Sequence, residues 1–131
     1  MVQSEGGDSI LDGKKHVRVT NDMKDGVLIY LHCRSKNDDL GVHVIANGEF
    51  QEWSFKDNLG DTTLFWCSMD AYNVQMSFEV YSAKTDSAKC DKQCYRSLRK
   101  DGAYFYYQFQ NIWKKELSWT IHEPPTMPPA F

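Results

Sequence analysis

The stretch LIYLHCRSKNDDLGVHVI, residues 28–45, decides the fold class of this chain. Residues 27–33 are apolar or aromatic at nearly every position, in a run too short for an ordinary helix, and they predict a buried β-strand. Residues 34–41 are polar and end in glycine, which is typical of a loop, and residues 42–45 resume the apolar pattern. The stretch therefore predicts a β-hairpin.

The register of this hairpin decides which side chains share a face. One face is expected to carry two cross-strand pairs, Cys33 with Val42 and Leu31 with Val44. The other face is then expected to carry His32 with His43 and Tyr30 with Ile45. Two imidazoles beside Asp38 and Asp39 could bind a transition metal, but we favour the interpretation that both histidines have only polar partners, and we predict no metal site. The loop also lacks the spaced ligands and closing glutamate of an EF-hand calcium site.

Further short strands follow from alternation and turn signals along the chain. They are predicted at residues 16–20, 50–55, 62–67, 76–83, 94–99, 103–109 and 117–121. Because Asn47 and Gly48 form a strong turn signal, residues 50–55 are expected to fold back on residues 42–45. Without a long amphipathic helix, the pattern indicates an all-β fold, an antiparallel β-sandwich of about eight short strands.

The predicted domain spans residues 15–121. It is preceded by a flexible segment, residues 1–14, and followed by a proline-rich disordered tail, residues 122–131. A chain of 131 residues is long enough for one core and is expected to be a monomer.

Charge and composition exclude several classes of protein. The chain has 15 basic and 18 acidic residues and no basic stripe, which argues against a nucleic-acid partner. No apolar run approaches the length of a membrane span, so membrane insertion is not predicted. No motif for a catalytic nucleophile, metalloprotease or phosphate-binding loop is present, so we predict neither an enzyme nor a cofactor.

Four cysteines in a small β-rich chain favour a secreted protein with two disulfides. Residues 1–7 lack the apolar core of a signal peptide, so we expect that the leader is absent from this sequence. Three pairings are open, and we prefer Cys33 with Cys94 and Cys67 with Cys90, because bridges that close large loops stabilise most. The crossed pairing, Cys33 with Cys90 and Cys67 with Cys94, is the second choice, and a Cys90 with Cys94 bridge would close only a tiny loop.

Several short motifs, taken in order, resemble the plant self-incompatibility S1 family of S-protein homologues. They are His32 with Cys33, SKNDDLG at 35–41, TTLFWC at 62–67, FEVY at 78–81, and Cys90, Cys94 and the Asp101–Gly102 turn. The resemblance covers about residues 16–121 and implies a small, secreted plant β-sandwich with two disulfides. Similar proteins act as cell–cell signalling ligands, the best known being the stigma determinant of poppy self-incompatibility, although most homologues have no assigned role.

One position departs from the family pattern. Similar proteins usually carry tryptophan two residues after the last cysteine, and this chain has Arg96 there. Since Arg96 falls on the expected inner face with Cys94 and Leu98, either its charged end reaches outward over a buried stem or the local register differs.

The resemblance and the lack of catalytic motifs together predict a ligand that presents loops to a cell-surface receptor. The candidate receptor-binding residues lie in three charged loops: Arg34, Lys36, Asn37, Asp38, Asp39, Lys56, Asp57, Asn58, Asp61, Lys84, Asp86, Lys89, Asp91 and Lys92. The alternative is a cell-wall carbohydrate-binding module, which would need exposed aromatic rings. We favour core packing for the tryptophans, because Trp53 shares a face with Phe55.

Overall fold

The computed structural model describes residues 13–120, which fold into nine strands and one short helix. The strands are β1 (Lys15–Asn21), β2 (Ile29–Ser35), β3 (Asp39–Ile45), β4 (Phe50–Phe55), β5 (Leu64–Ala71), β6 (Val74–Ser82), β7 (Cys94–Arg99), β8 (Gly102–Tyr107) and β9 (Ile112–Ser118), with helix α2 (Ala83–Asp86) after β6. The predicted tail lies outside the described residues, as does the predicted lead-in apart from residues 13 and 14. No helix in the described part is long and apolar enough to cross a membrane.

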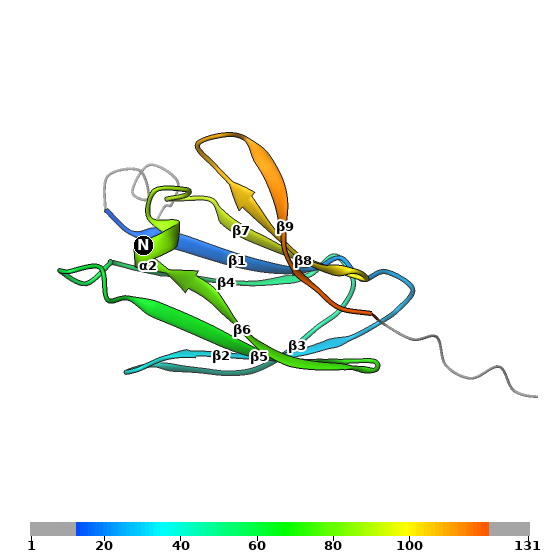
Figure 1. The fold of residues 1–131 in the computed structure, drawn as a ribbon. Coiled ribbons are helices and arrows are strands. Elements are labelled where there is room, and N and C mark those ends of the chain that lie inside the picture. The colour runs from blue at the N-terminus through cyan, green and yellow to red at the C-terminus, as the bar shows by residue number, and fades with distance from the viewer. Residues whose placement is uncertain (1–12, 121–131) are drawn as a thin grey trace, which may run out of the picture.

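The strands form two sheets that pack face to face (Figure 1). One sheet has five strands in the order β4-β1-β7-β8-β9, and the other has four in the order β3-β2-β5-β6. The predicted all-β sandwich is confirmed. The parallel pairing within it was not predicted: β1 and β7 run parallel in the middle of the larger sheet, with Val17 opposite Cys94.

The turn at Asn47 and Gly48 joins the two sheets instead of closing a hairpin. Strand β4 pairs with β1, with Val17 opposite Trp53, so the predicted pairing of residues 50–55 with residues 42–45 is wrong. Hydrogen bonds of Asn21 hold the point where the chain passes from one sheet to the other. Its buried side chain donates to the carbonyl oxygens of Val27 and Ile45, both at 2.8 Å. Its backbone also pairs with the turn, since Gly48 donates to the Asn21 carbonyl oxygen. This end of β3 is therefore fixed to the β1–β2 connection, and the chain continues into the opposite sheet.

The hairpin of β2 and β3 is confirmed, but its predicted register is wrong by one residue. His32 lies opposite Val42 and Leu31 opposite His43, so His32 and His43 do not share a face. The register shifts again between His32 and Arg34, where Cys33 faces two residues of β3, and Gly41 in this β-bulge has a φ of +77°. An apolar run with little alternation cannot reveal such a bulge.

The core lies between the sheets. Strand β6 alternates as predicted, with Phe78 and Val80 buried and Ser77 and Glu79 exposed. The three residues predicted to share a face, Thr63, Phe65 and Cys67, are also buried, the last two on β5 and Thr63 just before it. At one end of the core, Phe55 packs between two rings, 4.7 Å from Phe65 and 5.0 Å from Tyr81 between ring centres. These aromatic contacts fix the positions of the loops that follow β4 and β6.

Candidate functional site

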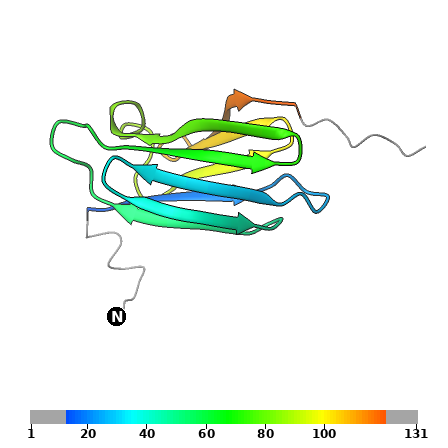
Figure 2. The ribbon, with the colours of Figure 1, turned by 90° about the horizontal axis from the view of Figure 1, so that it is seen from below.

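The three charged loops chosen from the sequence lie at the same end of the sandwich. Strands β2, β4 and β6 all end there, and β3, β5 and β7 begin there. Figure 2 shows the turn after β2, the long loop after β4 and helix α2 side by side at this end. We call it the loop end.

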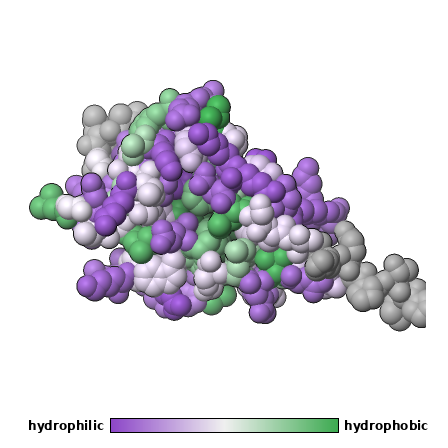
Figure 3. Space-filling view, viewed as in Figure 1, coloured by the Kyte–Doolittle hydropathy of each residue, from purple (hydrophilic) through white to green (hydrophobic). Residues whose placement is uncertain are grey.

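A groove of about 550 Å³ opens between the β2–β3 turn and the β4–β5 loop. Its lining combines charged and amide side chains of the two loops with aromatic and hydroxyl side chains from the adjoining strands: Ser35, Lys36, Asn37, Asp38, Phe55, Lys56, Asn58, Thr62, Thr63, Leu64, Phe65 and Trp66. Prediction from the sequence found Lys36, Asn37, Asp38, Lys56 and Asn58. It missed the remaining lining residues, which lie mostly on or beside the strands, because a strand pattern does not show which side chains border a cavity. Figure 3 shows that hydrophilic residues cover most of the visible surface and that apolar residues gather between the two sheets.

The β2–β3 turn is held by short-range hydrogen bonds. The amide of Ser35 donates to the carbonyl oxygen of Asp38, and the Asp38 amide donates to the Ser35 hydroxyl. The Asp39 carboxylate accepts the Gly41 amide at 2.9 Å and lies 2.6 Å from His32 Nε2. The bond from Gly41, then that from His32, lowers the pKa of Asp39 below its usual value. These contacts leave the Lys36 side chain exposed at the tip of the turn.

In the β4–β5 loop, Asp57 turns inward. Its two carboxylate oxygens each accept a hydrogen bond from the Tyr81 hydroxyl at 3.0 Å, and Lys15 Nζ lies 3.8 Å away. Burial of the phenol, followed by its bond to Asp57, raises the pKa of Tyr81. Asp57 therefore anchors its loop to the core, whereas the neighbouring Lys56 is exposed.

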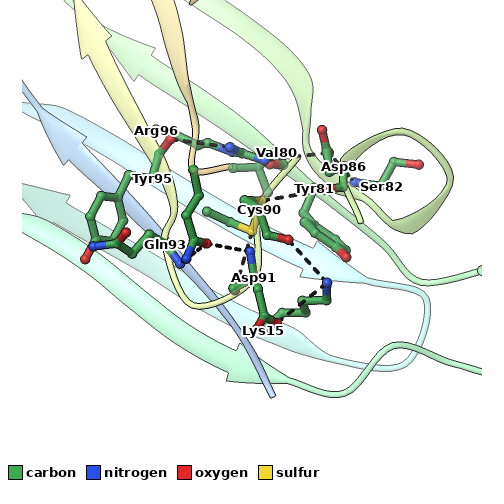
Figure 4. Close-up of a disulfide and its surroundings, with 12 residues drawn as sticks. Lys15, Val80, Tyr81, Ser82, Asp86, Cys90, Asp91, Gln93, Tyr95 and Arg96 are labelled. Atoms are coloured by element: carbon green, nitrogen blue, oxygen red, sulfur yellow. Dashed lines mark hydrogen bonds and ion pairs between the residues drawn. A yellow bond between two sulfur atoms is a disulfide. The ribbon is translucent and has the colours of Figure 1, made fainter. Parts of the chain in front are cut away.

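Arg96 is the largest fully buried side chain in the described residues, with 1% of its surface exposed. Its Nε donates to the Val80 carbonyl oxygen at 2.8 Å, and Nη2 lies 3.6 Å from the Asp86 carboxylate (Figure 4). The guanidinium also lies 4.0 Å from the Phe105 ring centre. Burial lowers the pKa of Arg96 to about 10, and the Asp86 charge opposes this effect. Of the two alternatives that the sequence left open for Arg96, an outward-reaching charged end is therefore wrong.

Asp86 is also removed from the candidate receptor-binding residues. It is 7% exposed, and besides its ion pair with Arg96 it accepts the Ser82 amide at 2.8 Å. This carboxylate fixes helix α2 against β6 and β7 from inside the protein, so it is not accessible to a receptor.

The disulfides are Cys33–Cys67 and Cys90–Cys94, and both predicted pairings are wrong. Cys33 and Cys67 lie directly opposite each other on β2 and β5, with their Cα atoms 3.9 Å apart. Cys94 begins β7 in the other sheet, and a bend of the chain brings Cys90 to within 5.1 Å of it between Cα atoms. The prediction chose the pairing that closes the larger loops, and it is wrong because the positions of the cysteines in the sheets decide which sulfur atoms can meet.

The Cys90–Cys94 bend is held by neighbouring strands (Figure 4). The Gln108 side-chain oxygen accepts the amides of Asp91 and Gln93, at 2.7 and 3.1 Å. Lys15 Nζ donates to the Cys90 carbonyl oxygen and lies 3.7 Å from the Asp91 carboxylate. The bend is thus a rigid support for the β6–β7 segment, and Asp91 is engaged within the protein.

No cluster of three or more metal-binding side chains exists among residues 13–120. The hypothetical site at His32 and His43 is not assembled, since His32 contacts Asp39 whereas His43 Nε2 bonds to the Leu40 carbonyl oxygen at 2.9 Å.

The tryptophans do not form an open platform for sugar rings. Trp53 packs on Phe65 in the core with ring centres 5.6 Å apart, and of the four tryptophans only Trp113 is an exposed residue in the described part. Trp113 belongs to a row of rings across the outer face of the larger sheet, which sequence reasoning missed: Phe50, Tyr95, Tyr106 and Trp113. The Arg18 guanidinium lies over two of them, 4.3 Å from the Phe50 ring centre and 4.6 Å from that of Tyr95, so these two ring faces are occupied by a cation within the protein.

These features define a class of protein: a small, all-β sandwich with a packed core, two buried disulfides and a loop-lined groove at one end. The chain belongs to the plant self-incompatibility protein S1 family, whose sequence model matches residues 16–119.

Relatives in two plants support this assignment. The chain is 33% identical to self-incompatibility protein S1 of Papaver rhoeas over 100 residues, which cover 75% of this chain and 72% of that protein. It is 37% identical to S-protein homolog 24 of Arabidopsis thaliana over 90 residues, covering 68% of this chain but only 59% of the relative.

A solved structure of a self-incompatibility protein homologue, from a family described as small, highly stable, secreted plant proteins, has the same fold. It covers 88% of this chain and 91% of its own, with a TM-score of 0.55 and 21% sequence identity.

Proposed function

We propose that this chain is a secreted, non-catalytic, monomeric ligand that presents its loop end to a protein receptor at a cell surface. The observation that carries the proposal is that the three charged loops lie at one end of a core with two disulfides, and that two of these loops border one groove. Rigid scaffolds that hold variable polar loops are typical of recognition proteins. Support for secretion comes from the described homologue and from the engagement of all four cysteines in disulfides.

A saturation experiment with labelled, oxidised protein and plant plasma-membrane vesicles tests this function. We expect saturable binding that unlabelled protein displaces and that protease treatment of the vesicles abolishes. Sedimentation of the free protein should give the mass of one chain. Absence of saturable binding in vesicles from every plant tissue tested would contradict the receptor-ligand function.

The carbohydrate-binding alternative has less support, because Arg18 covers the rings of Phe50 and Tyr95, and Trp113 is the only exposed tryptophan among residues 13–120. Quenching of tryptophan fluorescence by iodide distinguishes the two classes. A ligand of the proposed kind should show strong shielding of most indole rings, with quenching dominated by Trp113.

A further inference from the structure

The charges at the loop end are not equally available to a partner. Among residues 13–120, the acidic side chains there are largely engaged within the protein: Asp39 with His32, Asp57 with Tyr81, Asp86 with Arg96 and Asp91 with Lys15. Within the same described range, neither Lys36 nor Lys56 has an ion-pair partner, and both are exposed. The loop end of a chain with a formal net charge of −3 therefore carries these two exposed lysines, alongside the exposed acids Asp38 and Asp61.

Both of these lysines line the groove, one from each loop, and Asp38 is the only acidic residue in its lining. A third cation lies beside it, since the Arg34 guanidinium is 5.9 Å from the ring centre of the lining residue Trp66. The remaining lining offers amides from Asn37 and Asn58 together with apolar surface from the strands. Two ammonium groups flanking a partly apolar cavity complement a carboxylate carried on an aliphatic stem.

We propose that this groove receives an acidic side chain, aspartate or glutamate, from an extracellular segment of the receptor, with Lys36 and Lys56 as its charge partners. This inference rests on the receptor-ligand function proposed above and specifies the chemistry of the partner. A peptide carboxylate fits better than an acidic glycan, because the Trp66 ring on which a sugar could stack is already faced by Arg34. Leu59, fully exposed in the same loop as Lys56, offers an apolar contact beside the charged pair.

The test compares charge-reversal variants in the vesicle assay. The double variant Lys36→Glu/Lys56→Glu should lose roughly tenfold or more in affinity, and its remaining binding should depend less on salt than that of the wild type. Lys24→Glu is the control, because Lys24 is exposed, lies in the β1–β2 connection at the opposite end of the sandwich and does not line the groove. This control reverses one lysine charge, whereas the double variant reverses two. Its affinity should stay within about twofold of that of the wild type. Circular dichroism of each variant should show an unchanged fold.

Three further treatments identify the source of the negative charge. Amidation of carboxylates on the vesicles with carbodiimide and glycine ethyl ester should abolish binding, as should protease. Polygalacturonase treatment should leave binding unchanged, and protein-free vesicles containing phosphatidylserine should not bind. Loss of binding with polygalacturonase, or binding to the lipid alone, would overturn the inference by showing a glycan or a membrane surface as the partner.

The outcomes separate this inference from the function on which it rests. Saturable, protease-sensitive binding that the double variant retains in full would reject the groove as the acidic site and leave the ligand function standing. Absence of any saturable wild-type binding would reject both.

Discussion

The Asp86 carboxylate lies 3.6 Å from Nη2 of a fully buried Arg96, and that nitrogen has no hydrogen-bond partner among the described residues. The pair joins helix α2 to β7 beneath the β6–β7 segment. A buried guanidinium is tolerated only while a carboxylate, a carbonyl oxygen and an aromatic face share its charge. The loop end thus depends on an ionic contact inside the protein.

Replacing Asp86 should be costly. Asp86→Ala leaves the charge of Arg96 buried without its partner and should lower the free energy of unfolding by about 3 kcal/mol, measured by guanidinium chloride denaturation. The double variant Asp86→Ala/Arg96→Met should recover part of this loss because the unpaired charge is gone. Asp38→Ala, at an exposed acid, should change stability by less than about 0.5 kcal/mol. A double variant less stable than Asp86→Ala would show that the unpaired charge of Arg96 does not cause the loss of stability.

The two disulfides should contribute unequally. In the loop-entropy relation, the sequence separation of 34 between Cys33 and Cys67 corresponds to about 4 kcal/mol, and the separation of 4 between Cys90 and Cys94 to about 2 kcal/mol. The alanine pair at 33 and 67 should therefore unfold at lower denaturant than the pair at 90 and 94. Mass mapping of unreduced peptides verifies the pairing first. Equal losses would mean that strain or residual structure, rather than loop closure, sets their effect.

Asn21 should be essential for joining the sheets. Asn21→Leu removes both donors to the carbonyl oxygens of Val27 and Ile45 and the acceptor for the Met23 amide, and should cost about 3 kcal/mol of stability. Asn47→Ala is the control, because this exposed side chain bonds to the same connection and should cost about 1 kcal/mol. Thermal unfolding of both variants measures the difference. Equal effects would contradict the central role of the buried amide.

Alkaline pH should reduce the contribution that Tyr81, bonded to Asp57, makes to the stability of the folded protein. Since the pKa of Tyr81 is raised in the folded protein, its contribution is fully present below the ordinary value of 10.0. Above that pH the unfolded chain releases the phenolic proton first, so stability should fall as pH rises further. The stability difference between the wild type and Tyr81→Phe, measured by denaturation from neutral to alkaline pH, should shrink in this window. A difference that stays constant with pH would show that the phenol titrates normally.

Sequence reasoning succeeded where local alternation carries the signal. The inward residues of β6, Phe78 and Val80, and those of β4, Trp53 and Phe55, follow from their spacing alone. Such a pattern shows which side of a strand is buried but not which strand lies beside it. The pairing of β4 with β1 instead of β3 depends on the buried Asn21 amide, whose partners come from distant parts of the chain.

Prediction of the site was limited for the same reason. The three loops were identified by charge, but Asp57 and Asp86 have the same side chain as the exposed Asp38, and only tertiary contacts distinguish them. The cysteine pairing failed because loop length says nothing about the cross-strand position of Cys33 opposite Cys67. Arg96 is placed in the core by partners on β6, β8 and α2 that its own strand does not reveal.

The pairing of the four cysteines also bears on how the oxidised protein is made. Cys90 and Cys94 are separated by 4 residues, so their thiols meet far more often in the unfolded chain than any other pair. Once they are joined, Cys33 and Cys67 are left as each other's sole partners, and hydrogen bonding of β2 to β5 brings them face to face. The chain can reach its native cross-links by two successive oxidations, without an isomerase to rearrange mispaired intermediates.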